Sequence, residues 1–141
     1  MGEQEDGEEV SGAGVRSSKA FVRLLNNVTV KTLWIYVLYV LRRRPTYPYD
    51  VKRTIREEFG FNPPTVTLYT VMYRLERDGF IRRDPNGMYY ITPRGLEALK
   101  EAAAVLTEIV EKISAAAYEP AEVRQELAKG AGGPQEVGAH H

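Results

Sequence analysis

The sequence predicts a mainly α-helical fold with one small β-hairpin, and three observations carry this prediction. Apolar residues recur at the spacing of helix faces in five segments of the chain. Asn86-Gly87 lies between two short segments rich in β-branched and aromatic residues, which is a strong hairpin signal. Proline or glycine stands at the ends of most segments, where helices begin or stop.

The first three helices are expected over residues 17–26, about 30–44 and 48–59. The first is short and amphipathic. The second holds the most apolar run of the chain, "LWIYVLYVL", and Pro45 stops it. The third begins with a proline in its first turn and ends at Gly60, because glycine readily adopts the left-handed conformation that follows a helix.

A fourth helix is expected at about 64–78, with Gly79 as its stop. The hairpin follows at 81–91. Thr92 then caps a long helix that covers 93–118. Helices at 30–44, 48–59 and 64–78 followed by a hairpin form a winged helix-turn-helix. In this fold the last of the three helices, here 64–78, enters the DNA major groove.

Charges are unevenly distributed, although the net charge is zero. Residues 1–14 carry five acids and no base, and residues 119–141 carry four acids and two bases. Residues 15–118 therefore carry 17 bases and 10 acids, a net charge of +7. A basic body suits a polyanion such as nucleic acid, and a solvated surface is the alternative interpretation.

Several classes of site are excluded by composition. The chain has no cysteine, and its two histidines are His140 and His141 at the C-terminal end. A thiolate zinc site and a histidine-based metal site or general base within the fold are therefore not expected, and neither is a cofactor or an enzymatic activity. The apolar run at 33–41 is too short to span a bilayer, and the acidic N-terminus does not resemble a signal peptide. We expect a cytoplasmic protein.

The helix at 64–78 is the candidate recognition helix. Leu68, Val71, Met72 and Leu75 have the spacing of a core face. Hydroxyls, aromatic rings and cations cover the rest, and no acid precedes Glu76, so this surface suits base edges and phosphates. A solvated helix back is the alternative. The candidate DNA-contacting residues of this helix are Thr65, Val66, Thr67, Tyr69, Thr70, Tyr73, Arg74 and Arg77.

The hairpin supports the same interpretation. Arg82, Arg83 and Asn86 lie at or near its tip, and a basic wing contacts the sugar–phosphate backbone or the minor groove. Protection of an edge strand by charge is the alternative. Lys52 and Arg53 near the start of the 48–59 helix are weaker candidates for phosphate contact.

The last helix carries an apolar seam at alternating spacings of three and four residues, which is a heptad pattern. A second copy of the chain is its expected partner, and packing on Phe21, Leu24 and Leu25 of the same chain is the alternative. A dimer would present two recognition helices to a palindromic operator. The predicted dimer-interface residues are Leu96, Leu99, Ala103, Leu106, Val110, Ile113 and Ala117.

Four parts follow from these patterns. Residues 1–16 are expected to form a disordered acidic tail, because they are rich in acid and glycine. Residues 17–92 form the winged-helix DNA-binding domain with its short N-terminal helix. Residues 93–118 form the dimerisation helix, and residues 119–141 form a loosely ordered tail.

Three passages of the sequence resemble the PadR family of winged-helix transcriptional regulators. "YPYDVKRTI" is similar to the segment that opens the family's second helix, and "YYITPRGLEAL" to the exit of its wing. "TLYTVMYRLERDGFI" resembles its recognition helix, although Val66 replaces a small residue and Thr70 a proline. The matching positions of that helix are Thr67, Leu68, Tyr69, Arg74, Leu75, Glu76 and Gly79.

The resemblance implies a dimeric repressor of prokaryotic type that binds double-stranded DNA at the nucleoid. The single helix after the wing is similar to the family's short subgroup. Some such regulators respond to a small aromatic effector, for which Trp34 is the candidate pocket residue, with Tyr36 and Tyr39 nearby. Core aromatics are the alternative interpretation of these three residues. A winged-helix protein-interaction module without a DNA role remains the alternative function, because the total charge is neutral and the tails are acidic.

Overall fold

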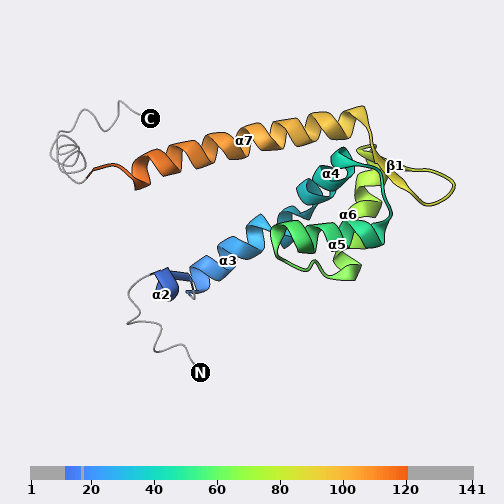
Figure 1. Ribbon diagram of the computed structural model, residues 1–141. Coiled ribbons are helices and arrows are strands. Elements are labelled where there is room, and N and C mark those ends of the chain that lie inside the picture. Colours follow the sequence, from blue (N-terminus) through green and yellow to red (C-terminus); the bar gives the residue numbers. More distant parts are fainter. Residues whose placement is uncertain (1–11, 17, 121–141) are drawn as a thin grey trace, which may run out of the picture. The chain divides into compact units, whose positions relative to one another are not determined.

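The computed structural model describes residues 12–16 and 18–120 (Figure 1). The chain divides into two compact units after Glu101. The first unit is the winged helix, and the second contains the C-terminal part of the last helix. The elements are α2 (Gly12–Arg16), α3 (Lys19–Val28), the 3-10 helix η1 (Val30–Thr32), α4 (Leu33–Arg43), α5 (Pro48–Phe59), α6 (Thr65–Arg77), β1 (Ile81–Arg83), β2 (Tyr89–Ile91) and α7 (Pro93–Ala117).

The predicted fold class, mainly α with one antiparallel hairpin, is confirmed, and the bounds differ in three places near the N-terminus. The helix predicted at 17–26 is α3, Lys19–Val28. The acidic tail predicted at 1–16 lies outside the described residues up to residue 11, but Gly12–Arg16 forms the short helix α2. The helix predicted from Val30 begins as η1 and becomes α-helical at Leu33. Most of the tail predicted at 119–141 lies outside the described residues.

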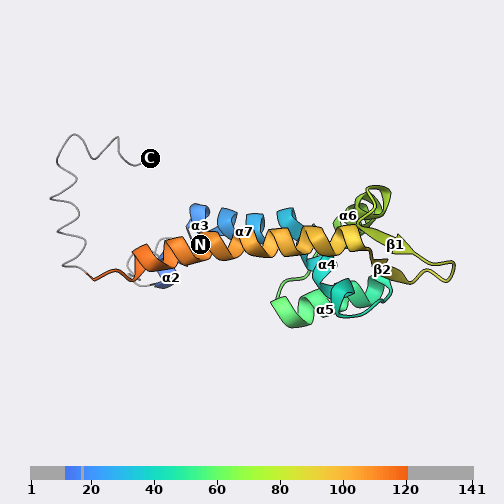
Figure 2. The same ribbon diagram turned by 90° about the horizontal axis from the view of Figure 1, so that it is seen from above.

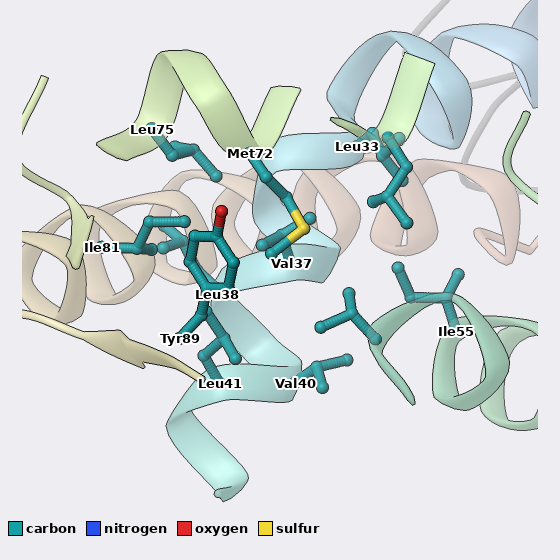
Figure 3. Close-up of a cluster of buried hydrophobic side chains, with 12 residues drawn as sticks. Leu33, Val37, Leu38, Val40, Leu41, Ile55, Met72, Leu75, Ile81 and Tyr89 are labelled. Carbon is teal, nitrogen blue, oxygen red and sulfur yellow. The ribbon is translucent and has the colours of Figure 1, made fainter. Parts of the chain in front are cut away.

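Helix α4 is the central element of the winged helix, where it packs against α5, α6 and β2. Contacts on several sides explain why its sequence is apolar almost all round. The helical stretch Lys19–Arg43 that contains α4 is, within the described residues, long and apolar enough to cross a membrane. The burial of α4 accounts for the apolar residues in the second part of this stretch, Leu33–Arg43. The α4 side chains that are buried in the core (Figure 3) are Leu33, Val37, Leu38, Val40 and Leu41.

Helices α5 and α6 cover α4 with the faces that their periodicity predicts. In α5, Val51 and Ile55 are buried, and Gly60 ends the helix in the left-handed region with φ +78°. In α6, Leu68, Met72 and Leu75 are buried. The opposite side of α6 is therefore turned away from the core.

The wing is the antiparallel pair β1–β2, in which Ile81 faces Ile91 and Arg83 faces Tyr89. Its turn differs from the predicted two-residue Asn-Gly turn. The Gly87 N–H donates to the Asp84 carbonyl, so Pro85 and Asn86 occupy the two central positions. Proline fixes a negative φ at the first of these, which selects an ordinary turn instead of a mirror-image one.

A residue from the α4–α5 connection extends the wing on its other edge. Thr46 forms an isolated antiparallel bridge with Tyr89, with backbone hydrogen bonds in both directions. The Thr46 hydroxyl also donates to Asp50 Oδ2 at 3.0 Å. The wing is thereby attached to the start of α5 as well as to α7.

The junction between wing and α7 depends on Thr92 and Gly95. Thr92 Oγ1 accepts the Gly95 N–H at 3.1 Å, as predicted for a cap, and it donates to the Gly79 carbonyl at 2.7 Å. Gly95 is buried, and a Cβ added there would lie 2.1 Å from the Phe80 carbonyl oxygen. Thr92 and Gly95 thus join the end of β2 and the start of α7 to the Gly79–Phe80 segment that follows α6.

Gly95→Ala is expected to lower the free energy of unfolding by about 3 kcal/mol, because the new methyl group meets backbone that cannot move aside cheaply. Helix propensity alone predicts the opposite sign, a gain of roughly 1 kcal/mol. Chemical denaturation followed by circular dichroism measures the difference. The reverse exchange at an exposed position of the same helix, Ala104→Gly, is the control and should cost about 1 kcal/mol. A stabilised Gly95→Ala protein would contradict the close approach.

Candidate nucleic-acid interface

The exposed face of α6 is the centre of the candidate interface. Val66 is 77% exposed, Tyr73 63% and Tyr69 51%, although apolar and aromatic side chains are ordinarily buried. Thr65, Thr70, Arg74 and Arg77 are also exposed, whereas Thr67 is partly buried. Both ribbon views place α6 beside the hairpin (Figures 1 and 2). The predicted contact residues of α6 therefore share one helix surface, with Thr67 at its edge.

Lys52 has a structural role that the sequence did not reveal. Its Nζ donates to the Pro63 carbonyl at 2.7 Å and to Thr65 Oγ1 at 2.9 Å. These bonds connect α5 to the turn before α6 and to the first residue of α6. Lys52 therefore positions the N-terminal turn of the candidate recognition helix, and one of its three N–H donors remains for a phosphate.

Two other predicted cations are paired with acids on their own chain. Arg53 forms an ion pair with Asp50 at 2.8 Å, and its guanidinium lies 5.9 Å from the centre of the Tyr49 ring. Arg77 hydrogen-bonds to Asp78 at 3.0 Å, and this bond holds the pKa of the Asp78 carboxyl below its usual value. The sequence made both arginines candidate DNA contacts but could not show which neighbouring acid each side chain reaches.

The wing arginines are available to a ligand. Arg82 lies 4.2 Å over the Tyr90 ring, and Arg83 lies 6.0 Å from the Tyr89 ring centre. Among the described residues neither forms an ion pair. Adjacent strand residues point to opposite faces, so the two guanidiniums serve different sides of the hairpin. Arg83 lines an open cleft of about 540 Å³ between the wing loop and Glu76 of α6.

Asp84 organises the wing loop, and sequence reasoning missed it. Its Oδ1 accepts the backbone N–H groups of Asn86 and Met88 at 2.9 and 3.0 Å, and its Oδ2 accepts the Tyr90 hydroxyl. The Met88 N–H, followed by the other donors, lowers the pKa of the Asp84 carboxyl. Aspartate at the first position of the D-P-N-G turn was the signal.

A second cavity, of about 380 Å³, lies on the other side of α6. Trp34 lines it, together with Phe80, Val71 and the cationic side chains of Lys31 and Arg74. Arg74, predicted to contact DNA, thus borders this cavity. The cavity is built partly from the helix that carries the candidate DNA surface.

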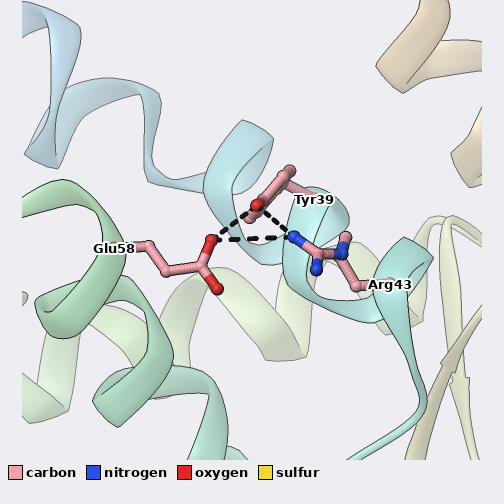
Figure 4. Close-up of polar contacts among 3 residues, drawn as sticks. All are labelled: Tyr39, Arg43 and Glu58. Carbon is pink, nitrogen blue, oxygen red and sulfur yellow. Dashed lines mark hydrogen bonds and ion pairs between the residues drawn. The ribbon is translucent and has the colours of Figure 1, made fainter.

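Tyr36 and Tyr39 do not line this cavity and have structural partners, as the core-aromatic interpretation expected. The Tyr39 hydroxyl donates to Glu58 Oε1, and Arg43 donates to the same hydroxyl at 2.7 Å (Figure 4). The Tyr36 hydroxyl donates to the Val28 carbonyl, and its ring packs edge-on against Phe59. These contacts connect α4 to α5 and to the end of α3.

The predicted seam of α7 divides into two parts. Leu96 and Leu99 are partly buried, and Leu99 packs against the core of its own winged helix. From Ala103 onward the seam residues are exposed, and Val105 and Ile109 add a second exposed apolar row. The apolar face of the C-terminal part of α7 is therefore broader than a heptad seam.

Comparison with known proteins shows which fold and which family model this chain resembles. Residues 37–101 match the transcriptional regulator PadR-like family. A transcriptional regulator from Clostridium thermocellum is 23% identical, with a TM-score of 0.51, over 62% of this chain and 92% of that chain. A Thermoplasma acidophilum protein is 22% identical, with a TM-score of 0.50, over 65% and 92%.

The crystal structure of Bacillus subtilis PadR is 25% identical, with a TM-score of 0.48, over 52% of this chain and 42% of that chain. The chain thus spans less than half of the length of that protein. None of the curated proteins matches the sequence. The matched segment contains α5, α6, both strands of the wing and the start of α7. Through this segment, the chain is similar to the transcriptional regulator PadR-like family.

Proposed function

We propose that this protein is a dimeric DNA-binding transcriptional regulator that acts as a repressor. The exposed face of α6 is the observation that carries the proposal: it offers hydroxyls, aromatic rings and cations, and no acid precedes Glu76. A surface without negative charge can approach the polyanionic groove without repulsion. In this function α6 enters the major groove, and the protein resides with DNA at the nucleoid in the cytoplasm of a prokaryote.

The proposed role of each side chain depends on its position in α6, in the wing or in α5. Residues at the N-terminal end of a recognition helix reach base edges, so Thr65, Val66, Tyr69, Thr70 and Tyr73 are proposed as base contacts. Thr67 lies at the edge of this surface. Arg82, Arg83 and Asn86 of the wing are proposed to contact the backbone. Lys52, Arg53 and Arg77 are secondary phosphate contacts, because each already has a partner on the chain.

The exposed apolar face of α7 supports the proposed homodimer. Leu106 is 46% exposed, Val110 58% and Ile113 63%, and these residues lie on one side of a single helix. Exposed apolar surface of this extent marks an interaction site. A second copy supplies an identical face, and a two-fold dimer would bind a palindromic operator. The proposed interface continues through Ala103 and Ala117, and Leu96 and Leu99 contribute where they remain exposed.

A protein-interaction module without a DNA role is the second candidate function. The same exposed Val66, Tyr69 and Tyr73 favour it, because aromatic residues are enriched in protein interfaces. The two functions differ in their dependence on salt and on the wing arginines.

The Trp34 cavity supports a proposed effector site. Its aromatic and aliphatic lining suits a small aromatic compound. The lining carries two cations, Lys31 and Arg74, and one carboxylate, Asp78, which is already paired with Arg77, so an anionic compound is favoured over a cationic one. Because Val71 and Arg74 belong to α6, occupancy of the cavity would act directly on the recognition helix.

Binding of fluorescein-labelled duplex DNA from the protein's own promoter region is expected to weaken linearly in log affinity with log salt concentration. Arg82→Ala and Arg83→Ala should each reduce that slope by about one, because each removes a phosphate contact. Arg56→Ala, which removes the same charge from the last turn of α5, is the control and should leave the slope unchanged. Affinity that is independent of salt, or unaltered by alanine at both Tyr69 and Tyr73, would favour the interaction module.

Ile113→Lys is expected to weaken self-association by roughly 100-fold or more, because it places an unpaired charge in an apolar interface. Analytical ultracentrifugation over a range of concentrations measures the change. Ala104→Lys adds the same charge to the opposite side of the helix and should leave association intact. A wild-type dissociation constant for Ile113→Lys would rule out this face as the interface.

Trp34 is the one tryptophan of the chain, so its fluorescence reports on the cavity directly. A panel of aromatic acids and aromatic amines should include an acid that changes the emission saturably, and Arg74→Ala should weaken this binding about ten-fold through the loss of a charged partner. Arg44→Ala is the matched control. If no compound saturates the signal, or if the amines bind best, the effector site as proposed is wrong.

A further inference from the structure

Val66 is an apolar residue with no packing role in the described structure. It lies in the first turn of α6, with 77% of its surface exposed, and does not belong to the core or to the residues packed against it. A β-branched residue also has no advantage in an exposed helical turn. Its methyl groups are therefore free for contact with a ligand.

Thr70 presents a second methyl group on the same surface. Its hydroxyl donates to the Val66 carbonyl at 2.9 Å, one turn back along the helix. This bond uses the one proton of the hydroxyl and holds the side-chain rotamer. Because residues four apart are neighbours on a helix, the free methyl of Thr70 lies beside the methyls of Val66.

The charged donors of α6 come after its first two turns. Arg74 follows Thr70 by one turn and borders the Trp34 cavity, and Arg77 follows Thr70 by two turns and is paired with Asp78. Tyr69 and Tyr73, both more than half exposed, stand next to the pair on the same face. The first two turns of α6 therefore offer methyl groups, hydroxyls and rings, and no guanidinium or amide that could form a bidentate bond with guanine or adenine.

One feature of the major groove matches such a surface. The C5-methyl group of thymine is the apolar feature that a base pair displays in that groove, and side-chain methyl groups contact it. We propose that Val66 and Thr70 recognise a C5-methyl pyrimidine in each half-site: thymine, and by the same chemistry 5-methylcytosine. The inference rests on the DNA-binding function proposed above and names the base class that α6 selects.

The test begins with duplexes selected from a random pool by the full-length protein. Each thymine of the selected site is replaced in turn by deoxyuridine, which removes the methyl group and keeps every hydrogen-bonding group. At one or more positions of each half-site, wild-type affinity should fall roughly four-fold, the effect of one buried methyl group. At the same position, a 5-methylcytosine site should bind about four-fold more tightly than a cytosine site.

Variants connect this effect to the two residues. V66A and T70S, which each remove methyl groups from the pair, should each reduce the difference in affinity between the thymine and deoxyuridine duplexes at the sensitive position. V66T keeps one methyl group at position 66 and is the control that should retain the wild-type discrimination. Position 66 is exposed, so circular dichroism should show unaltered folding for all three variants.

The outcomes separate this inference from the function on which it rests. Salt-dependent DNA binding that no deoxyuridine substitution weakens would overturn the inference and leave the regulator function in place. Full discrimination by V66A would overturn it as well, because another residue would then contact the methyl group. Absence of salt-dependent DNA binding would overturn the proposed function itself.

Discussion

Burial of α4 is the interaction on which the rest of the winged helix depends. Helices α5 and α6 and strand β2 cover its five buried side chains and exclude water from them. This burial stabilises the fold by on the order of 10 kcal/mol. Each covering element contributes one apolar face and is therefore orientated by that contact. The outward direction of α6 is a consequence of its burial, because a helix that packs Leu68, Met72 and Leu75 inward must present Val66 and Tyr73 to solvent.

Polar contacts then set the details that apolar packing leaves open. Lys52 holds the first turn of α6 from α5, Thr46 attaches the wing to the start of α5, and Thr92 joins the wing to α7. Asp84 shapes the loop that carries Asn86. Lys52, Thr92 and Asp84 form these contacts through their side chains, and Thr46 forms its bridge through the backbone. The candidate DNA surface is thus supported by Thr46, Thr92 and Asp84, which lie outside it, and by Lys52, which is itself a proposed phosphate contact.

Helical periodicity predicted which faces of α6 are buried and exposed, and it did not predict the partners of individual side chains. The exposure of Val66, Tyr69 and Tyr73 followed from the helical period, since one period determines both the buried and the exposed side. The pairing of Arg53 with Asp50 and the place of Arg74 beside Trp34 did not follow, because long flexible side chains have many reachable neighbours. Leu99 was assigned to a dimer seam, yet it packs on its own core, since a heptad pattern does not specify which chain covers it.

The sequence by itself determined the order of helices and hairpin, the core faces of α5 and α6, the cap at Thr92 and the resemblance to the PadR family. These features depend on local periodicity and on residues such as glycine and proline, whose backbone preferences act within a few positions. Only the tertiary structure decided the Thr46–Tyr89 bridge, the Lys52 contacts and the approach of Gly95 to the Phe80 carbonyl. The first two contacts join residues that are distant in the chain. The third brings two backbone segments so close that there is no room for a Cβ atom between them. All three form only when packing on α4 has brought the elements together.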